Sequence, residues 1–334
     1  NQPHQNARRH ALRLLDGVFR LLGGSRAILI SDETLKHLGM TDRIAAVLLE
    51  EEIEVPIVYT EIPTDSSLST ANKIAGICRK NDIDMIIGLG GGSVIDTAKG
   101  VRMILSQNSD DILKLSGYEG LPAGSPVPLC IIPTTSGTGS EVTGVAVIRD
   151  ENRDLKMEFI SAHIQPDIAV LDPQMTQSMP PKVTAATGMD ALCHAVEGYT
   201  CLQKNPLSDA YAVTALRTIA GSLKKAVADG SDTDARIEMA NAALMAGISF
   251  SNSMVGIVHG IGHALGAVCR IPHGTAMNIL LPHCMMYNMD VCGERYADLL
   301  LYLAGAEVYA STPEKERAEA CIRSIRSLSE ELHT

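Results

Sequence analysis

The hydrophobic residues in the first half of the chain fall into short runs separated by stretches with helical spacing. The apolar runs predict β-strands at residues 27–30, 57–59, 85–89 and 129–133, and two further strands at 146–149 and 168–171. The stretches between them predict helices at residues 42–52, 69–81 and 96–106. Strands that alternate with helices of about ten residues indicate βαβ units. We therefore expect an α/β domain with a parallel, doubly wound (Rossmann-like) sheet.

The pattern changes after about residue 180, where strand-like runs end and long segments rich in Ala, Leu and Met follow. Their periodicity predicts helices at residues 184–200, 206–227, 233–250 and 314–332. The dipeptide Pro180-Pro181 interrupts either kind of element. We therefore expect two domains, an α/β domain at residues 1–181 and an all-helical domain at residues 182–334.

One stretch of the helical half, residues 245–269, contains no Asp, Glu, Lys or Arg, so a hydropathy window could take it for a membrane span. The same stretch contains His259, His263, Asn252, three serines and five glycines. We therefore expect a pair of buried helices in a soluble protein, with no membrane partner. Residues 1–20 are polar and basic without an apolar centre, so no signal peptide is expected.

The composition narrows the class of protein. The 334 residues are 46% hydrophobic, which is enough to form the cores of two domains. Asp and Glu number 39 against 28 Lys and Arg, and this net charge of −11 argues against nucleic acid as a partner. Aromatic residues make up 3% and there is no Trp. The eight cysteines form no C-x-x-C motif, which predicts buried thiols in a reducing cytoplasm rather than disulfides.

A glycine-rich turn follows the predicted strand at residues 85–89. It reads Gly88-Leu89-Gly90-Gly91-Gly92-Ser93 and leads into a helix for which Ser93 would be a good N-cap. Glycines let a backbone approach a pyrophosphate, and the helix N-terminus supplies N–H groups and a positive dipole end. Ser93 stands where the G-x-G-x-x-G fingerprint has its third glycine, so an ordinary tight turn is the alternative. We favour phosphate binding.

Two further features lie where predicted strands end. The segment from Thr134 to Glu141 consists mainly of hydroxyl residues and glycines, which suit a ribose or phosphate but also occur in solvated loops. Two such turns at the carboxyl ends of strands mark the usual ligand site of an open α/β sheet. Asp32 follows the first strand. Its carboxylate could bind a ribose 2′-OH and repel a 2′-phosphate, which would favour NAD over NADP. It could also cap a helix that begins at Glu33, and the two roles are compatible.

Histidines and one aspartate indicate a metal site in the helical half. Asp190 and His194 are four residues apart, as are His259 and His263, so each pair shares a helix face. His273 follows after a turn marked by Pro272. One carboxylate with several imidazoles in apolar surroundings is typical of a divalent metal site, suited to Fe or Zn. The spacing leaves open whether His259 or His263 is the ligand.

Four ordered motifs together carry a family resemblance. They are Gly90-Gly91-Gly92-Ser93-x-x-Asp96-x-x-Lys99; Pro133-Thr134-Thr135-x-Gly137-Thr138-Gly139-Ser140-Glu141; Gly188-x-Asp190-Ala191-x-x-His194-x-x-Glu197; and His259-Gly260-x-x-His263-x-x-Gly266 with Pro272-His273-Gly274. In these motifs and their separations the chain resembles the iron-containing (group III) alcohol dehydrogenases from about residue 15 to residue 334.

The resemblance implies an NAD(P)-binding α/β domain, a helical metal domain and a cleft between them. It implies Fe²⁺, with Zn²⁺ as the alternative, bound by Asp190, His194, His259 and His273. It implies that His263 lies near the nicotinamide and the substrate. The implied cofactor positions are Gly91, Gly92 and Ser93 at the phosphates, Asp96 in the same motif, Thr134, Thr135 and Thr138 in the second loop, and Asp32 as the NAD-preferring acid.

The implied reaction is reversible hydride transfer between NAD(H) and a small primary alcohol, diol or aldehyde. A mostly uncharged substrate is expected because the residues around the histidines are apolar, namely Phe250, Met254, Val255, Ile257 and Val258, with Val145 as a further apolar wall. We further expect a cytoplasmic homo-oligomer, specifically a dimer.

Two alternatives remain. One is an NAD- and metal-dependent lyase or cyclase of the dehydroquinate-synthase kind, which would need Lys, Arg and Asn around the metal for a highly charged substrate. The other is a non-catalytic NAD- or metal-binding fragment. It is suggested by the absence of the family's opening strand around residues 3–7 and by an end that precedes the family's last helices.

Overall fold

The computed structural model describes residues 22–116 and 127–334, which form two compact units. Unit 1 runs to Thr134 and also contains Gly144–Met175. Unit 2 contains Thr135–Thr143 together with Thr176–Thr334. The segment Thr135–Thr143 thus groups with the helices although it precedes the predicted boundary at 181/182, which stays a prediction. The expectations for residues 1–20, including the missing opening strand, lie outside the described residues.

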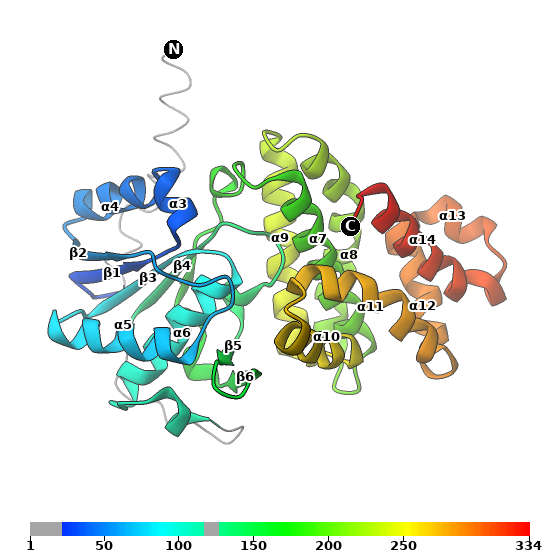
Figure 1. Ribbon diagram of the computed structural model, residues 1–334. Coiled ribbons are helices and arrows are strands. Elements are labelled where there is room, and N and C mark those ends of the chain that lie inside the picture. Colours follow the sequence, from blue (N-terminus) through cyan, green and yellow to red (C-terminus); the bar gives the residue numbers. More distant parts are fainter. Residues whose placement is uncertain (1–21, 117–126) are drawn as a thin grey trace, which may run out of the picture. The chain divides into compact units, whose positions relative to one another are not determined.

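Unit 1 is built on a sheet of five parallel strands, as predicted (Figure 1). In spatial order these are β2 (Glu54–Tyr59), β1 (Arg26–Ile30), β3 (Met85–Gly90), β4 (Leu129–Pro133) and β7 (Ile168–Ala169). All six residues of β3 are buried, as expected for a central strand of a parallel sheet that is covered on both faces. The register pairs Ile30 with Gly88 and Gly90 with Pro133, so the carboxyl ends of β1, β3 and β4 are adjacent.

Helices cover both faces of this sheet. Because side chains alternate along a strand, Ile28 and Ile30 of β1 pack with α5 (Leu68–Lys80) and α6 (Gly92–Ser106). Ala27 and Leu29 face the other way, in the cluster that includes side chains of α4 (Met40–Glu50) and of the short α3 (Glu33–His37). Figure 1 shows α5 and α6 on one side of the sheet and α3 and α4 on the other.

Helix α6 begins earlier than the sequence indicated. Its first residue is Gly92 and its N-cap is Gly91, so the prediction that Ser93 is the N-cap was wrong. Only Gly91 separates the last residue of β3, Gly90, from the first residue of α6, Gly92. A Cβ at Gly90 would lie 2.5 Å from Val94 Cγ2, so a side chain there would collide with the first turn of α6.

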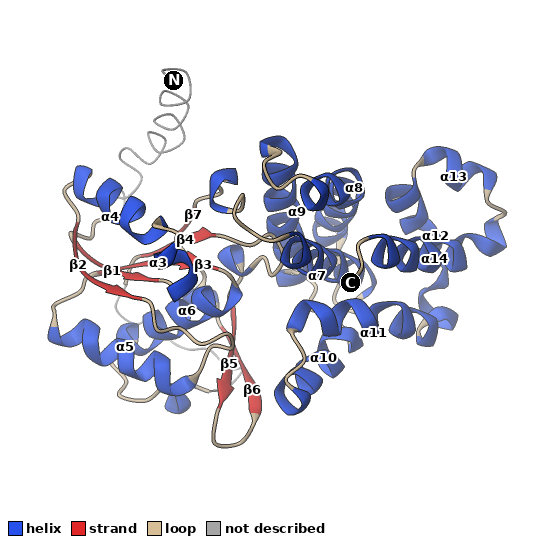
Figure 2. Ribbon diagram, turned by 45° about the horizontal axis from the view of Figure 1, so that its top comes forward, coloured by secondary structure: helices blue, strands red, loops and turns tan. Residues whose placement is uncertain are grey.

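A separate two-stranded antiparallel hairpin follows β4 (Figure 2). It consists of β5 (Val145–Asp150), which was expected, and β6 (Leu155–Ile160), which was not. Two side chains of α6 hold β5: Asp96 Oδ2 accepts the N–H of Val147 at 2.9 Å, and the buried Lys99 donates from Nζ to the carbonyl of Val145 at 2.7 Å.

Unit 2 is all-helical in its described elements of four or more residues, as predicted. Its helices are α7 (Pro181–Thr200), α8 (Pro206–Ala228), α9 (Thr233–Ser251), α10 (Ile257–Cys269), α11 (His273–Tyr287), α12 (Met289–Ala304), α13 (Ala306–Ser311) and α14 (Arg317–Glu331). Helices α11, α12 and α13 were not predicted individually. Helix α7 packs against α8 and α9, and most of its residues from Thr184 to Gly198 are buried. This burial places the candidate site residues of α7 inside a helical core.

The charge-free stretch 245–269 comprises the end of α9 and all of α10, so the expected pair of helices is confirmed. Within the described ranges, no helix is long and apolar enough to cross a membrane. The pair is not wholly buried, however, because α10 exposes Ile261 and Val268.

Glycines allow the segment Thr135–Thr143 to pack closely against helices of unit 2. Gly139 has a φ of +61°, and a Cβ there would lie 2.7 Å from both the carbonyl oxygen of Ala243 and the Cα of Gly247 on α9. A Cβ at Gly137 would lie 2.8 Å from the carbonyl oxygen of Thr187 on α7. These two glycines therefore permit close backbone contact with α7 and α9.

Candidate active site

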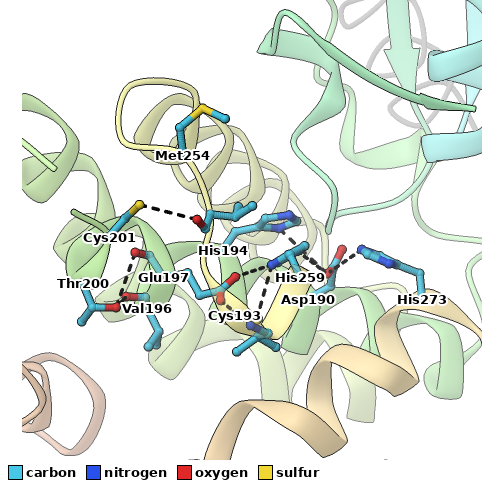
Figure 3. A network of polar contacts seen from close by, with 12 residues as sticks. Asp190, Cys193, His194, Val196, Glu197, Thr200, Cys201, Met254, His259 and His273 are labelled. Carbon is cyan, nitrogen blue, oxygen red and sulfur yellow. Dashed lines mark hydrogen bonds and ion pairs between the residues drawn. The ribbon is translucent and has the colours of Figure 1, made fainter. Parts of the chain in front are cut away.

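The predicted metal ligands converge on one carboxylate oxygen in unit 2. Asp190 and His194 lie one turn apart on α7, His259 lies on α10, and His273 is the first residue of α11. Asp190 Oδ1 is 3.4 Å from His273 Nε2, 3.9 Å from His259 Nε2 and 4.0 Å from His194 Nδ1 (Figure 3). The fold thus brings together four side chains that are up to 83 residues apart in sequence.

The donor atoms of this cluster fit a divalent cation. Asp190, His194 and His259 can each place one ligand atom within 4.8 Å of the others, and all three residues are buried. Asp190 Oδ1 and His194 Nδ1 are buried without a hydrogen-bond partner among the described residues. Buried polar atoms are normally hydrogen-bonded, and exceptions call for an explanation such as an ion. Imidazole and carboxylate donors suit iron and zinc.

The electrostatics of the cluster favour the metal-binding protonation states. Burial lowers the pKa of His194 to about 3, against the opposing attraction of Asp190, so this imidazole is neutral near pH 7. Burial alone would raise the pKa of Asp190, but the nearby imidazoles of His194, His273 and His259 outweigh it and hold that pKa below its usual range. A neutral imidazole and an ionised carboxylate are the forms that bind a metal.

His263 lies beside the cluster, one turn after His259 on α10. Its ring centroid is 5.7 Å from that of His259 and 5.4 Å from that of His273. The distance between His259 Nε2 and Asp190 Oδ1 supports His259 as the ligand and leaves His263 as its neighbour. These assignments stay predictions.

The apolar residues expected near the substrate are in different environments. Phe250 stacks on His194, with ring centroids 4.5 Å apart, and therefore lies at the cluster. Val258 is buried in the helical core with α7 and α8 side chains, so it supports the fold rather than a substrate. Val145 belongs to β5 of unit 1 and is half-buried.

Glu197 lies beside the cluster, although sequence reasoning assigned it no role. It lies on α7 one turn after His194, is buried, and contacts Nδ1 of His259 through Oε2 (Figure 3). Its other oxygen, Oε1, accepts the N–H of Val258 at 2.8 Å. The available signal was its place in the motif, seven residues after Asp190 and therefore on the same face of a helix.

The predicted nucleotide-binding residues of unit 1 lie along one edge of the sheet. Asp32, Gly91 and Thr134 follow the adjacent carboxyl ends of β1, β3 and β4. Ser31 Oγ donates to the carbonyl of Leu89 at 2.8 Å, and the N–H of Thr134 donates to the carbonyl of Gly90 at 3.0 Å. These bonds tie the three strand ends together. Asp32 also caps α3, as predicted, because its Oδ1 accepts the N–H of Leu35 at 2.9 Å.

Three other predicted cofactor residues, Ser93, Asp96 and Thr138, make side-chain hydrogen bonds within the protein. Ser93 donates to the carbonyl of Thr64, and Asp96 binds β5. Thr135 and Thr138 belong to unit 2, and Thr138 Oγ1 accepts the N–H of Ser140 at 3.2 Å. Their contacts with a cofactor, like that of Gly92, stay predictions.

The eight cysteines all lie in the described ranges and are free. The expectation of buried thiols holds for Cys78, Cys130, Cys193, Cys284 and Cys321, whereas Cys201 and Cys292 are half-buried. It was wrong for Cys269, which is exposed at the end of α10.

Comparison with known proteins gives two adjacent family matches. Residues 6–173 match the iron-containing alcohol dehydrogenase family, and residues 184–334 match the C-terminal part of that family. Long-chain-alcohol dehydrogenase 1 of Geobacillus thermodenitrificans is 40% identical over 306 residues, which cover 91% of this chain and 76% of the relative. These matches span the residues of both candidate sites.

Solved structures agree with this relationship. A crystal structure of a 1,3-propanediol oxidoreductase has a TM-score of 0.91 at 34% identity, covering 97% of this chain and 83% of that one. A sulfoacetaldehyde reductase from Bifidobacterium kashiwanohense, solved in complex with NAD⁺, has a TM-score of 0.84 at 28% identity, covering 96% of this chain and 82% of that one. With these family matches, its parallel sheet and its cluster of imidazoles around Asp190, the chain belongs to the iron-containing alcohol dehydrogenase family.

Proposed function

We propose that this protein catalyses reversible hydride transfer between NAD(H) and a small primary alcohol, diol or aldehyde. The observation that carries the proposal is the convergence of three imidazoles on the buried carboxylate of Asp190, in a chain of this family. Two atoms of this cluster, Asp190 Oδ1 and His194 Nδ1, have no hydrogen-bond partner within the described part of the chain, and a bound cation would satisfy both.

The donor set would be Asp190, His194, His259 and His273, and the metal we propose is Fe²⁺, with Zn²⁺ as the alternative. When bound, the ion supplies Lewis-acid polarisation of the substrate oxygen and so lowers the pKa of the alcohol. The protein contributes neutral imidazoles and an ionised carboxylate, held by three helices, so that the site is formed before substrate arrives.

His263 is the proposed proton carrier. Its ring lies 5.4 Å from that of His273 and it is half-buried, so it can contact both the ligand cluster and solvent. An imidazole with an ordinary pKa near 6.5 can accept the alcohol proton and release it to water at neutral pH. In the reverse direction the same imidazole would return a proton to the aldehyde oxygen.

For the cofactor we propose NAD(H), bound at the sheet edge of unit 1. The N-terminus of α6 follows β3 directly and offers backbone N–H groups and a positive dipole end for a pyrophosphate. Asp32 at the end of β1 would accept from a ribose 2′-OH. The NAD⁺ complex of the sulfoacetaldehyde reductase supports the choice of cofactor.

The proposed substrate is small and mostly uncharged. Phe250 stacks on the proposed ligand His194 and so offers an apolar surface beside the cluster. A phosphorylated substrate would leave its charge unpaired there, which is costly. The names of two of the similar proteins, a long-chain-alcohol dehydrogenase and a 1,3-propanediol oxidoreductase, support an uncharged alcohol or diol, whereas the sulfoacetaldehyde reductase is named for a substrate with a sulfonate charge.

The family match argues against the lyase alternative. We propose that the chain is an active enzyme rather than a non-catalytic fragment. We also propose that it is cytoplasmic and forms a homodimer.

The test combines metal analysis with turnover. Protein purified anaerobically should contain one divalent ion per chain and oxidise NADH with C2 to C6 aldehydes in preference to sugar phosphates or dicarboxylates. His273→Ala should lose metal and activity, whereas His263→Ala should keep metal and lose turnover. Metal binding without turnover of any alcohol or aldehyde would support the non-catalytic alternative, and a metal-free His263→Ala would reverse the two assigned roles.

A further inference from the structure

Glu197 links two parts of the metal site that come from different helices. It lies on α7, after the proposed ligands Asp190 and His194. Its carboxylate contacts Val258 and His259 of α10. The imidazole of His259 therefore lies between two carboxylates: Nδ1 contacts Glu197 Oε2, and Nε2 is 3.9 Å from Asp190 Oδ1 (Figure 3). The two ring nitrogens thus have different partners.

The same carboxylate stabilises the start of α10. The N-cap of this helix is Gly256, which has no side chain, and Val258 is the second residue of the helix. Glu197 Oε1 accepts the N–H of Val258 at 2.8 Å and so replaces the missing cap from outside the helix. A Cβ at Gly256 would lie 2.7 Å from Glu197 Oε1, so the glycine makes room for this contact.

Glu197 and His259 are both buried, and a carboxylate suits this position because it can accept both N–H groups. Glu197 is 5% exposed and His259 is 3% exposed, so solvent cannot replace either contact. A carboxylate has only acceptor sites and can take both N–H groups at once. Its negative charge is also stabilised by the N-terminal dipole of α10.

We propose that Glu197 is a positioning residue of the metal centre. By accepting a hydrogen bond from Nδ1, it keeps the proton of His259 on that nitrogen and leaves the Nε2 lone pair directed to the Asp190 side. Histidine ligands of metals commonly have their second nitrogen held in this way. This inference rests on the proposed metal-dependent function and adds a residue that acts through His259 without touching the metal.

The discriminating variant is Glu197→Gln, which is nearly isosteric. Its amide can accept one N–H but must present its NH₂ group to the other partner. Donation from that NH₂ group to Nδ1 would move the ring proton to Nε2, the nitrogen required for the metal. Glu238→Gln is the matched control, because Glu238 is an exposed carboxylate on α9 that binds Ser222 and carries the same change of charge.

The measurement is made on the full chain with Zn²⁺ alone, using chelator competition for affinity and ¹⁵N NMR of labelled histidines for the metal-free tautomer. His259→Asn identifies the His259 signals. In the wild type, His259 should carry its proton on Nδ1. Glu197→Gln should bind Zn²⁺ about 10- to 100-fold more weakly, with its proton shifted toward Nε2, whereas Glu238→Gln should match the wild type.

Two results would overturn the proposal. One is an Nε2-protonated His259 in the wild type, which is read without any variant and so does not depend on the folding of Glu197→Gln. The other is a Glu197→Gln protein with a lower melting temperature but unchanged tautomer and Zn²⁺ affinity, since Glu197 would then only cap α10. A wild type that binds Zn²⁺ but turns over no alcohol would instead refute the proposed reaction and leave this inference standing.

Discussion

Asp32 illustrates how one side chain can serve both fold and specificity at the residue scale. Its carboxylate caps α3 by accepting the N–H of Leu35, and its position after β1 places it at the sheet edge where a nucleotide would bind. Capping needs an acceptor oxygen, whereas discrimination against a 2′-phosphate needs a negative charge. The two roles can therefore be separated by a substitution that keeps the oxygen and removes the charge.

Asp32→Asn is that substitution, because Asn is an equally good N-cap. Wild-type enzyme should prefer NADH over NADPH by about 10- to 100-fold, which corresponds to about 1–3 kcal/mol of like-charge repulsion in a partly desolvated site. The variant should lose most of this preference without a change in melting temperature. The check is kcat/KM for both cofactors with one aldehyde. A wild type that uses NADPH equally well would remove Asp32 from this role.

The sequence was sufficient to name candidate metal ligands but not their mutual arrangement. Helical spacing placed Asp190 with His194 and His259 with His263, yet it could not distinguish His259 from His263 as the ligand. That distinction depends on how α10 packs on α7, which brings Nε2 of His259 to 3.9 Å from Asp190 Oδ1. The role of Glu197 depends on the same packing, because its partner lies 62 residues away in the chain.

At the scale of elements, the contact between the segment Thr135–Thr143 and α9 determines where the second hydroxyl-rich turn lies. The backbones of Gly139 and Gly247 approach so closely that a Cβ on either residue would lie 2.7 Å from a backbone atom of the other. The glycines of this turn therefore have a packing role, whatever the turn binds.

Gly139→Ala tests this packing. It adds a Cβ at positive φ and in a buried contact, so it should lower the free energy of unfolding of the protein by about 2–4 kcal/mol. Gly221→Ala is the control, because Gly221 is exposed within α8 and a Cβ there would meet nothing within 4 Å. That control should be neutral or stabilising by about 0.5–1 kcal/mol. Chemical denaturation measures both, and equal stability of the two variants would contradict the contact.

The strongly periodic elements were predictable and the others were not, for physical reasons. Central strands such as β3 are continuous apolar runs because both of their faces are buried. Strand β6 was missed because only Phe159 of its six residues is buried, so the strand has no run of apolar residues. Helix α11 contains Pro282, a residue that normally argues against a helix interior. The start of α6 was misplaced because glycines usually indicate a turn rather than a first helical turn.

At the scale of the whole molecule, the two candidate sites fall in different units. The sheet edge with Asp32 and Gly91 lies in unit 1, and all four proposed metal ligands lie in unit 2. The proposed metal ligands come from three helices, α7, α10 and α11, and α8 and α9 separate α7 from the other two along the chain. A bound ion would therefore cross-link the helical unit internally, and its effect on stability should be confined to that unit.

Removal of the metal should accordingly destabilise unit 2 selectively. An ion present at about 1,000 times its Kd would stabilise the folded helices by about 4 kcal/mol, and a chelator would remove this contribution. Hydrogen–deuterium exchange followed by mass spectrometry should then show lost protection in peptides from α7 and α10, with no change in β1 and β3. These strands are the internal reference, because the hydrophobic cluster around them contains none of the ligands. Loss of protection in both units to the same extent would show that their folding is coupled, and unchanged exchange throughout would argue against a structural contribution of the ion.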